Sequence, residues 1–196
     1  MFTGIIQDLG NIFHKENNLY NITTNLDLQN CKEGSSISCN GVCLTAKNIT
    51  KNKNGIYNFE VNISEETIKR TNLEICIFKN NKINIEKSLS IGDQIGGHFV
   101  YGHVDAITSL LDVKKLNNSW EYCFERNFKN NNKFIAEKAS ICINGISLTI
   151  ASIKNNSFNI SVIDHTFEKT NLQFLNKGDQ VNIEFDYLAR FILKDD

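Results

Sequence analysis

The chain has 196 residues, of which 41% are hydrophobic, and this is enough for one large core or two small ones. Its 21 basic and 22 acidic residues give a net charge of −1, and no stripe of Lys and Arg alternates with aromatic residues, which excludes the usual signature of a nucleic-acid-binding surface. The N-terminus has no basic region before an apolar run, and no stretch approaches the roughly 18 apolar residues of a membrane span, so we expect a cytoplasmic protein without a nucleic-acid or membrane partner.

Alternation of apolar and polar residues dominates the chain and predicts half-buried strands. The clearest alternating segments are 36–39, 59–63, 83–86, 158–162 and 181–185. Strand-sized runs recur about every ten residues, with Gly, Asn and Asp between them. We therefore expect an all-β protein built from small closed antiparallel barrels.

One short helix is expected to interrupt each half. Ser64, followed by Glu65 and Glu66, is a good N-cap, and Asp164 is expected to cap the second helix. Both helices should end near a shared Thr-Asn-Leu sequence. A last short helix is predicted for residues 188–196, because Leu188 and its apolar neighbours recur at helical spacing.

A hairpin sequence occurs twice and divides the chain. Residues 40–45 read Asn-Gly-Val-Cys-Leu-Thr, and residues 144–149 read Asn-Gly-Ile-Ser-Leu-Thr; Asn-Gly is the strongest signal for a two-residue hairpin turn. Three more pairs align: 2–6 with 100–104, 67–73 with 166–172, and 83–86 with 181–184. A tandem repeat follows, with predicted domains at 1–97 and 98–187 and the C-terminal helix after them. The Asn-rich tracts 51–55 and 130–132 are expected to be surface loops.

Two alternative sites arise from spacing alone. Cys39-x3-Cys43 and His98-x4-His103 fall within zinc spacings, but the second copy has no counterparts of the cysteines, so we predict no metal. The segment 96–103 is rich in glycine yet lacks the phosphate-loop patterns, and we interpret it as a linker between the barrels. The six cysteines stand at unrepeated positions without an export signal, which predicts free thiols.

Four stretches resemble the riboflavin synthase alpha-subunit family: 1–6, 40–45, 96–103 and 144–149. The resemblance covers nearly the whole chain. It implies two six-stranded Greek-key barrels, a C-terminal helix that helps to assemble a homotrimer, and a reaction without cofactor or metal. In that reaction one 6,7-dimethyl-8-ribityllumazine donates a four-carbon unit to a second one, which gives riboflavin and 5-amino-6-(ribitylamino)uracil. It also allows an association with lumazine synthase.

The resemblance further implies a ligand pocket in each barrel. The first pocket would use Phe2, Gly4, Ile5, Ile6, Cys43, Leu44, Thr45, Asn62, Ile63, Ser64, Glu65, Glu66 and Thr67. The second would use Gly102, His103, Val104, Lys138, Ser147, Leu148, Thr149, Ser161, Val162, Ile163, Asp164, His165 and Thr166, and Asp186 would belong to the functional set. Two departures from the family stand out: His165 replaces the usual Glu, and the tail after the last strand is short.

The residue types suit the expected chemistry. The lumazine methyl is an acidic C–H, so His103 is the candidate base that assists its removal. Hydroxyls of Thr45, Ser147 and Thr149 would hold ring atoms, and Cys43 would form a hydrogen bond to the ring or add to it covalently, the former being favoured. Phe2 is expected at the mouth of the first pocket.

The copies differ at two reactive positions, since Cys43 corresponds to Ser147 and Ile5 corresponds to His103. We therefore expect donor and acceptor roles to be divided between barrels, with Cys43 and His103 in separate barrels that meet between subunits. The alternative is a lumazine- or flavin-binding fluorescent accessory protein of the same fold without turnover. A flavin-dependent reductase would need a nucleotide-binding domain, and no βαβ pattern occurs.

Overall fold

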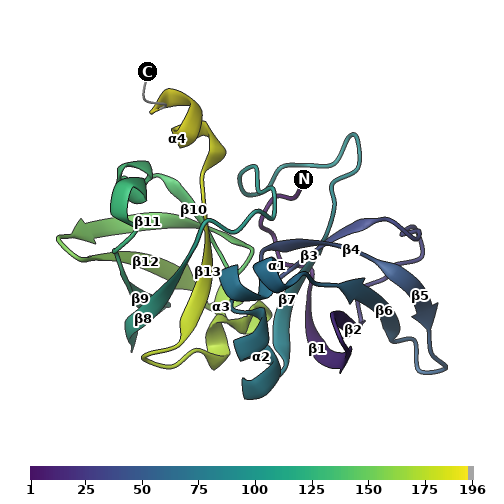
Figure 1. Ribbon diagram of the computed structural model, residues 1–196. Helices are drawn as coiled ribbons and strands as arrows, with labels where there is room; N and C mark the ends of the chain where they lie inside the picture. Colours follow the sequence, from purple (N-terminus) through teal and green to yellow (C-terminus); the bar gives the residue numbers. More distant parts are fainter. Residues whose placement is uncertain (194–196) are drawn as a thin grey trace.

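The structure, a computed structural model, describes residues 1–193. Figure 1 shows two mostly β halves side by side, with α1, α2 and α3 gathered between them and α4 projecting from the second half at the opposite end. No helix among residues 1–193 is long and apolar enough to span a bilayer.

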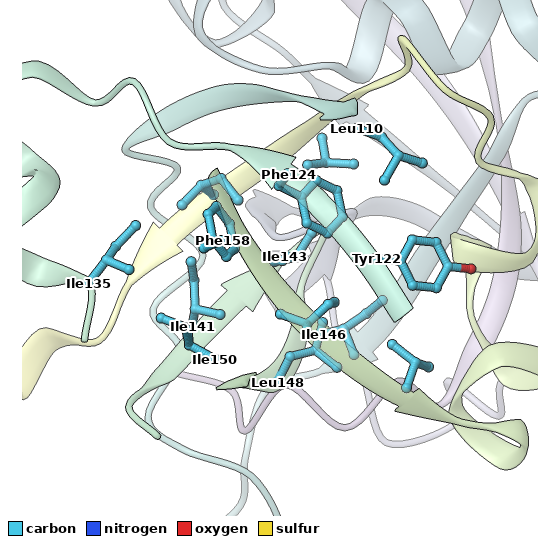
Figure 2. Close-up of a cluster of buried hydrophobic side chains, with 14 of the residues drawn as sticks. Leu110, Tyr122, Phe124, Ile135, Ile141, Ile143, Ile146, Leu148, Ile150 and Phe158 are labelled. Carbon is cyan, nitrogen blue, oxygen red and sulfur yellow. The ribbon is translucent and has the colours of Figure 1, made fainter. Parts of the chain in front are cut away.

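The second half is a closed six-stranded antiparallel barrel, as predicted. Its strands are β8 (Ala106–Lys115), β9 (Ser119–Glu125), β10 (Ser140–Ile143), β11 (Ile146–Lys154), β12 (Ser157–Ile163) and β13 (Gln180–Phe185). They follow the order β10-β11-β12-β9-β8-β13 around the barrel. Inward-pointing side chains such as Phe124, Phe158 and Ile150 fill its interior (Figure 2), which follows from the alternation in the sequence.

The first half is a strongly curled seven-stranded sheet, not the closed six-stranded barrel that was expected. Its strands are β1 (Asp8–Glu16), β2 (Leu19–Thr24), β3 (Ser36–Cys39), β4 (Val42–Thr45), β5 (Lys47–Lys51), β6 (Tyr57–Asn62) and β7 (Lys82–Lys87). β4 and β5 lie at the two ends of the strand order, although only Ala46 separates them in the chain. Together they correspond to the single strand β11 of the second half. The two edges of the curled sheet are therefore joined covalently through Ala46, where this strand is broken.

Helices and turns follow the sequence with three corrections. Ser64 caps α1 (Glu65–Arg70) by accepting a hydrogen bond from the Thr67 amide, as predicted. Asp164 is not a cap: α3 (Asp164–Lys169) begins at that residue, and Ile163 before it offers no capping oxygen. Each half also has a second helical turn, α2 (Leu73–Lys79) and the 3₁₀ helix η2 (Asn171–Phe174).

The third correction concerns the second Asn-rich tract, which forms the 3₁₀ helix η1 (Lys129–Phe134) and is not a loop. The final helix α4 spans Tyr187–Ile192, and residues 194–196 of the expected helix lie outside the described residues. Both Asn-Gly pairs form their hairpin turns with positive φ at both positions, 54° and 80° in the first copy and 49° and 83° in the second.

A buried asparagine network joins the two halves. Its members are Asn40, Asn72, Asn84, Asn144, Asn171 and Asn182, all of them buried. The Asn72 Nδ2 donates to Asn144 Oδ1 at 3.1 Å, and Asn171 Nδ2 donates to Asn40 Oδ1 at 2.7 Å, which is the same bond with the halves exchanged. Three of the repeated motifs each supply one asparagine per half. Part of the repetition therefore serves this interface.

Candidate active site

The first candidate site is organised around Cys43 and contains residues of both halves. The Cys43 amide on β4 donates to the Gly102 carbonyl at 2.9 Å, and Val104 packs against the core of the first half. The backbone thereby carries the exposed His103 into the part of the first half where Cys43 lies. We call this group, Cys43 with residues 102–104, the Cys43 site.

The second candidate site repeats this arrangement around Ser147. The Ser147 amide on β11 donates to the Gly4 carbonyl at 2.8 Å, and Ile6 packs against the core of the second half. A cavity of about 140 Å³ opens here. It is lined by Gly4, Ile5, Ile6, Ile146, Ser147, His165, Thr166, Lys169 and Thr170. We call this group the Ser147 site.

The segments that precede the first strand of each half, here called the lead-in segments, are therefore exchanged relative to the pockets to which the sequence assigned them. Gly4 to Ile6 lie against the second half, and Gly102 to Val104 lie against the first half. The cause is an isolated antiparallel bridge between Phe2 and Val100, at which the two segments run past each other. The chain then enters β1 after the first segment and β8 after the second. Cys43 and His103 consequently share one site within one chain, and the expectation that they occupy separate barrels is wrong.

Phe2 is not at the mouth of a pocket. Its side chain is 0% exposed and packs with Val100 and Cys142 between the halves, with Cys43 against this cluster. Phe2 thus supports the back of the Cys43 site instead of facing a ligand. Within the expected linker 96–103, Gly97 lies close to the N-terminal segment, since a Cβ on it would lie 2.1 Å from the Thr3 carbonyl oxygen.

Two buried glutamates anchor the crossing segments. Glu86 on β7 accepts from the amides of Thr3 and Gly4 at 2.8 and 3.0 Å. Glu184 on β13 accepts from the amides of Tyr101, Gly102 and His103 at 2.7, 2.8 and 3.0 Å. Burial raises the pKa of Glu184 to about 7, although these amide donors favour its charged form. The segment that holds His103 is thus fixed by the buried side chain of Glu184.

His98 is a site residue that the sequence did not identify. Its Nδ1 lies 2.6 Å from the Ser147 Oγ, so the two side chains share a hydrogen bond. Burial lowers the pKa of His98, and the negative charge of Asp186 opposes this effect more weakly. A neutral imidazole can accept the serine proton, which makes the pair a candidate for proton transfer. The only sequence signal was the spacing His98-x4-His103, which pointed to zinc instead.

We expect His98 to titrate below about 6.5, the usual value for histidine. As pH falls below about 6.5, the unfolded chain takes up this proton before the folded one, so the free energy of unfolding should fall. An NMR titration of the ring protons measures the midpoint, with His98→Gln used to assign the resonance. A midpoint at or above about 6.5 would contradict the burial argument.

The remaining predicted residues fall into three groups. Leu44 and Leu148 are buried in the two cores and serve packing, whereas Thr45 and Thr149 are exposed on the same strands. The stretch Asn62–Ser64 borders a separate open hollow of about 560 Å³, which it shares with residues 16–19 and not with Cys43.

The third group lies at element ends. Glu65 and Glu66 are exposed on α1. Ser161 and Ile163 are exposed near the end of β12 and Asp164 is exposed at the start of α3, while Val162 is buried. Lys138 is exposed at a positive φ of 68° just before β10, and Asp186 caps α4 through the Leu188 amide. Over residues 1–193 no cluster of three or more His, Cys, Asp or Glu could hold a metal, and all six cysteines are free.

Comparison with known proteins agrees with the tandem repeat. The lumazine binding domain family matches the chain twice, at residues 3–88 and 101–186. Riboflavin synthase of Brucella abortus is 36% identical over 97% of this chain and 96% of its own length. The chain belongs to the riboflavin synthase family.

Other riboflavin synthases align as fully. The Bacillus subtilis enzyme is 33% identical over 99% of this chain and 89% of its own length, and the Actinobacillus pleuropneumoniae enzyme is 36% identical over 99% and 91%. Among solved structures, LumP in complex with riboflavin superposes with a TM-score of 0.76 over 94% of this chain and 99% of its own. Its sequence identity is 23%, so this likeness concerns the fold.

Proposed function

We propose that this chain catalyses the reaction of the riboflavin synthase family. Two molecules of 6,7-dimethyl-8-ribityllumazine react, and one transfers a four-carbon unit to the other, which yields riboflavin and 5-amino-6-(ribitylamino)uracil. The observation that carries the proposal is the duplicated site with unequal side chains: Cys43 and His103 in one copy, Ser147 and His98 in the other. A reaction between two identical molecules in different roles needs two similar but unequal binding places.

Each reactive side chain has a role in this scheme. His103, exposed in the Cys43 site, is placed to assist removal of a proton from the lumazine methyl. Ser147, with its proton shared with His98, is placed to hold a ring atom of the other molecule or to exchange a proton with it. Cys43 acts as a hydrogen-bonding partner of the ring, and Thr45 and Thr149 offer exposed hydroxyls on the same strands. Alignment of the two lumazines contributes most, since positioning can be worth roughly 7–11 kcal/mol.

The complete active site lies between subunits of a homotrimer. The cavity at the Ser147 site, about 140 Å³, is smaller than the roughly 300–1,000 Å³ of typical ligand pockets, so one chain does not enclose a lumazine there. A trimer could place the Cys43 site of one chain against the Ser147 site of the next. Helix α4 offers an apolar contact surface for such assembly, with Leu188, Phe191 and Ile192 being 60%, 71% and 80% exposed.

The proposed domains are 1–97 and 98–187, followed by a C-terminal helix, and each lead-in segment packs against the other domain. A cytoplasmic location is supported by the six free cysteines, since disulfides persist mainly in oxidising compartments. Association with lumazine synthase would bring the substrate directly to the trimer.

The second candidate function is binding of lumazine or flavin without turnover. The fold similarity to LumP favours it, because LumP was crystallised with riboflavin and with 6,7-dimethyl-8-ribityllumazine. Against it stand the presence of Cys43, His103, Ser147 and Thr149 in the sequence and the 31–38% identity to riboflavin synthases.

Incubation with 6,7-dimethyl-8-ribityllumazine alone separates the two functions. We expect riboflavin absorbance to appear, and the rate to be the same with and without EDTA. Protein that binds the lumazine, seen as a change in ligand fluorescence, but forms no riboflavin would support the accessory-protein function. Activity lost to EDTA and restored by zinc would contradict a metal-free reaction.

A further inference from the structure

The segment that carries His103 is held by α4 as well as by Glu184. The ring of Tyr187 lies on the ring of Tyr101, with centroids 4.5 Å apart at 40°. The Arg190 guanidinium pairs with the Asp105 carboxylate. Tyr101 and Asp105 stand two residues before and two residues after His103, so α4 holds the segment on both sides of the histidine.

The matching segment of the first half lacks this hold. Gln7 corresponds to Asp105, and both accept a backbone hydrogen bond at 2.9 Å, Gln7 from Lys87 and Asp105 from Phe185. The neutral Gln7 amide has no charge to offer an arginine, whereas Asp105 uses its second oxygen for Arg190. The position of Tyr101 is taken by Thr3, which bonds to Glu86 instead. Within residues 1–193, the additional contacts therefore exist only on the segment that carries His103.

The position of the His103 side chain depends on its backbone. The side chain is exposed, and its ring lies beside that of Tyr101 with centroids 6.3 Å apart. A displacement of Tyr101 or Asp105 would therefore move the imidazole relative to Cys43, and errors of about 1 Å in a catalytic group can cost on the order of a hundredfold in rate.

We propose that Tyr187 and Arg190 of α4 are positioning residues that hold His103 in the Cys43 site through Tyr101 and Asp105. The proposal rests on the proposed function, in which the Cys43 site takes part in the reaction. It gives the short C-terminal helix a role within its own chain, in addition to any contact with other subunits.

Asp105→Gln is the sharpest test, because it gives the second half the residue that the first half already has at position 7. Gln can still accept from the Phe185 amide but releases Arg190. We expect Asp105→Gln and Arg190→Ala each to lower kcat about tenfold with KM within about twofold, because substrate binding is kept while the base is misplaced. The double variant should be no worse than Arg190→Ala, because both substitutions remove the same Arg190–Asp105 pair and Arg190→Ala also removes the contacts of Arg190 with the rings of Phe134 and Tyr187.

Lys79→Ala provides the matched control. The Lys79–Asp179 pair is exposed to a similar degree as the Arg190–Asp105 pair, 36% and 22% against 35% and 15%. Asp179 precedes the first residue of β13, whereas Glu184, which binds the His103 amide, lies near the other end of that strand. We expect a similar small shift in Tm but unchanged kcat. The His103 ring resonances in NMR should shift in Asp105→Gln and Arg190→Ala and stay unchanged in Lys79→Ala.

Wild-type kcat in both variants would overturn the proposal, and so would losses that add fully in the double variant. A loss of kcat in Lys79→Ala equal to that in Arg190→Ala would show a general stability effect and overturn it too. If wild-type protein makes no riboflavin, the proposed function fails separately. The His103 resonances then decide, and unchanged resonances in both variants overturn the positioning role.

Discussion

A mixture of Cys43→Ala and Ser147→Ala proteins should recover activity that neither variant has alone, whereas a mixture of Cys43→Ala and His103→Gln should stay inactive. The reason is the placement of the groups. Cys43 and His103 belong to one site of one chain, because the Gly102 carbonyl accepts from the Cys43 amide. Ser147 belongs to the other site, and in a trimer that site would meet the Cys43 site of a neighbouring subunit.

When the first pair of variants is mixed in equal amounts, each side of an interface comes from either variant with equal chance. About a quarter of the interfaces should therefore combine an intact Cys43 site with an intact Ser147 site. No interface in the second mixture has an intact Cys43 site. The variants are unfolded together, refolded, checked for mixed trimers by mass and assayed for riboflavin. Recovery in the Cys43→Ala and His103→Gln mixture would show that the two residues act from different subunits.

Gly102→Ala should reduce kcat by at least about a hundredfold. Gly102 has a φ of 77°, and a Cβ there would lie 2.6 Å from the Cys43 Cβ and 2.7 Å from the Cys43 amide nitrogen. The segment must then move away from Cys43 and takes His103 with it. Because strained backbone adds to the clash, the free energy of unfolding should also fall by more than the roughly 1–3 kcal/mol of strain alone.

Gly55→Ala isolates the strain from the clash. Gly55 has a similar φ of 84°, but a Cβ there meets nothing within 4 Å. This variant should lose only the strain energy and keep its kcat. Denaturant unfolding and steady-state kinetics on both proteins make the comparison, and equal kcat values would mean that the contact between Gly102 and Cys43 does not position the site.

The sequence predicted the strands and turns well because those signals are local. Alternation identified β3, β6, β7, β12 and β13, and Asn-Gly identified both hairpins. The repeat also identified the asparagines and glutamates of the shared motifs, but it did not show that they join the two halves and hold the crossing segments. The asparagine of Thr-Asn-Leu and that of Ile-Asn-Ile-Glu join the halves, and the glutamate of the latter holds a crossing segment.

The exchange of the lead-in segments could not be predicted, because it depends on one long-range bridge between Phe2 and Val100. The same limit applies to His98, whose partner Ser147 is 49 positions away in the chain. The prediction that Asp164 caps α3 was wrong by one residue, since Ile163 and not Asp164 corresponds to Ser64. The break at Ala46 has no sequence signal that we recognise.

Quantifying all three compounds after a single quenched incubation tests the central claim most directly. With 6,7-dimethyl-8-ribityllumazine as the only substrate, the account predicts that riboflavin and 5-amino-6-(ribitylamino)uracil form in equal amounts, each at half the amount of lumazine consumed. Lumazine recovered unchanged from protein that binds it, or riboflavin formed without an equal amount of the pyrimidine, would contradict the account.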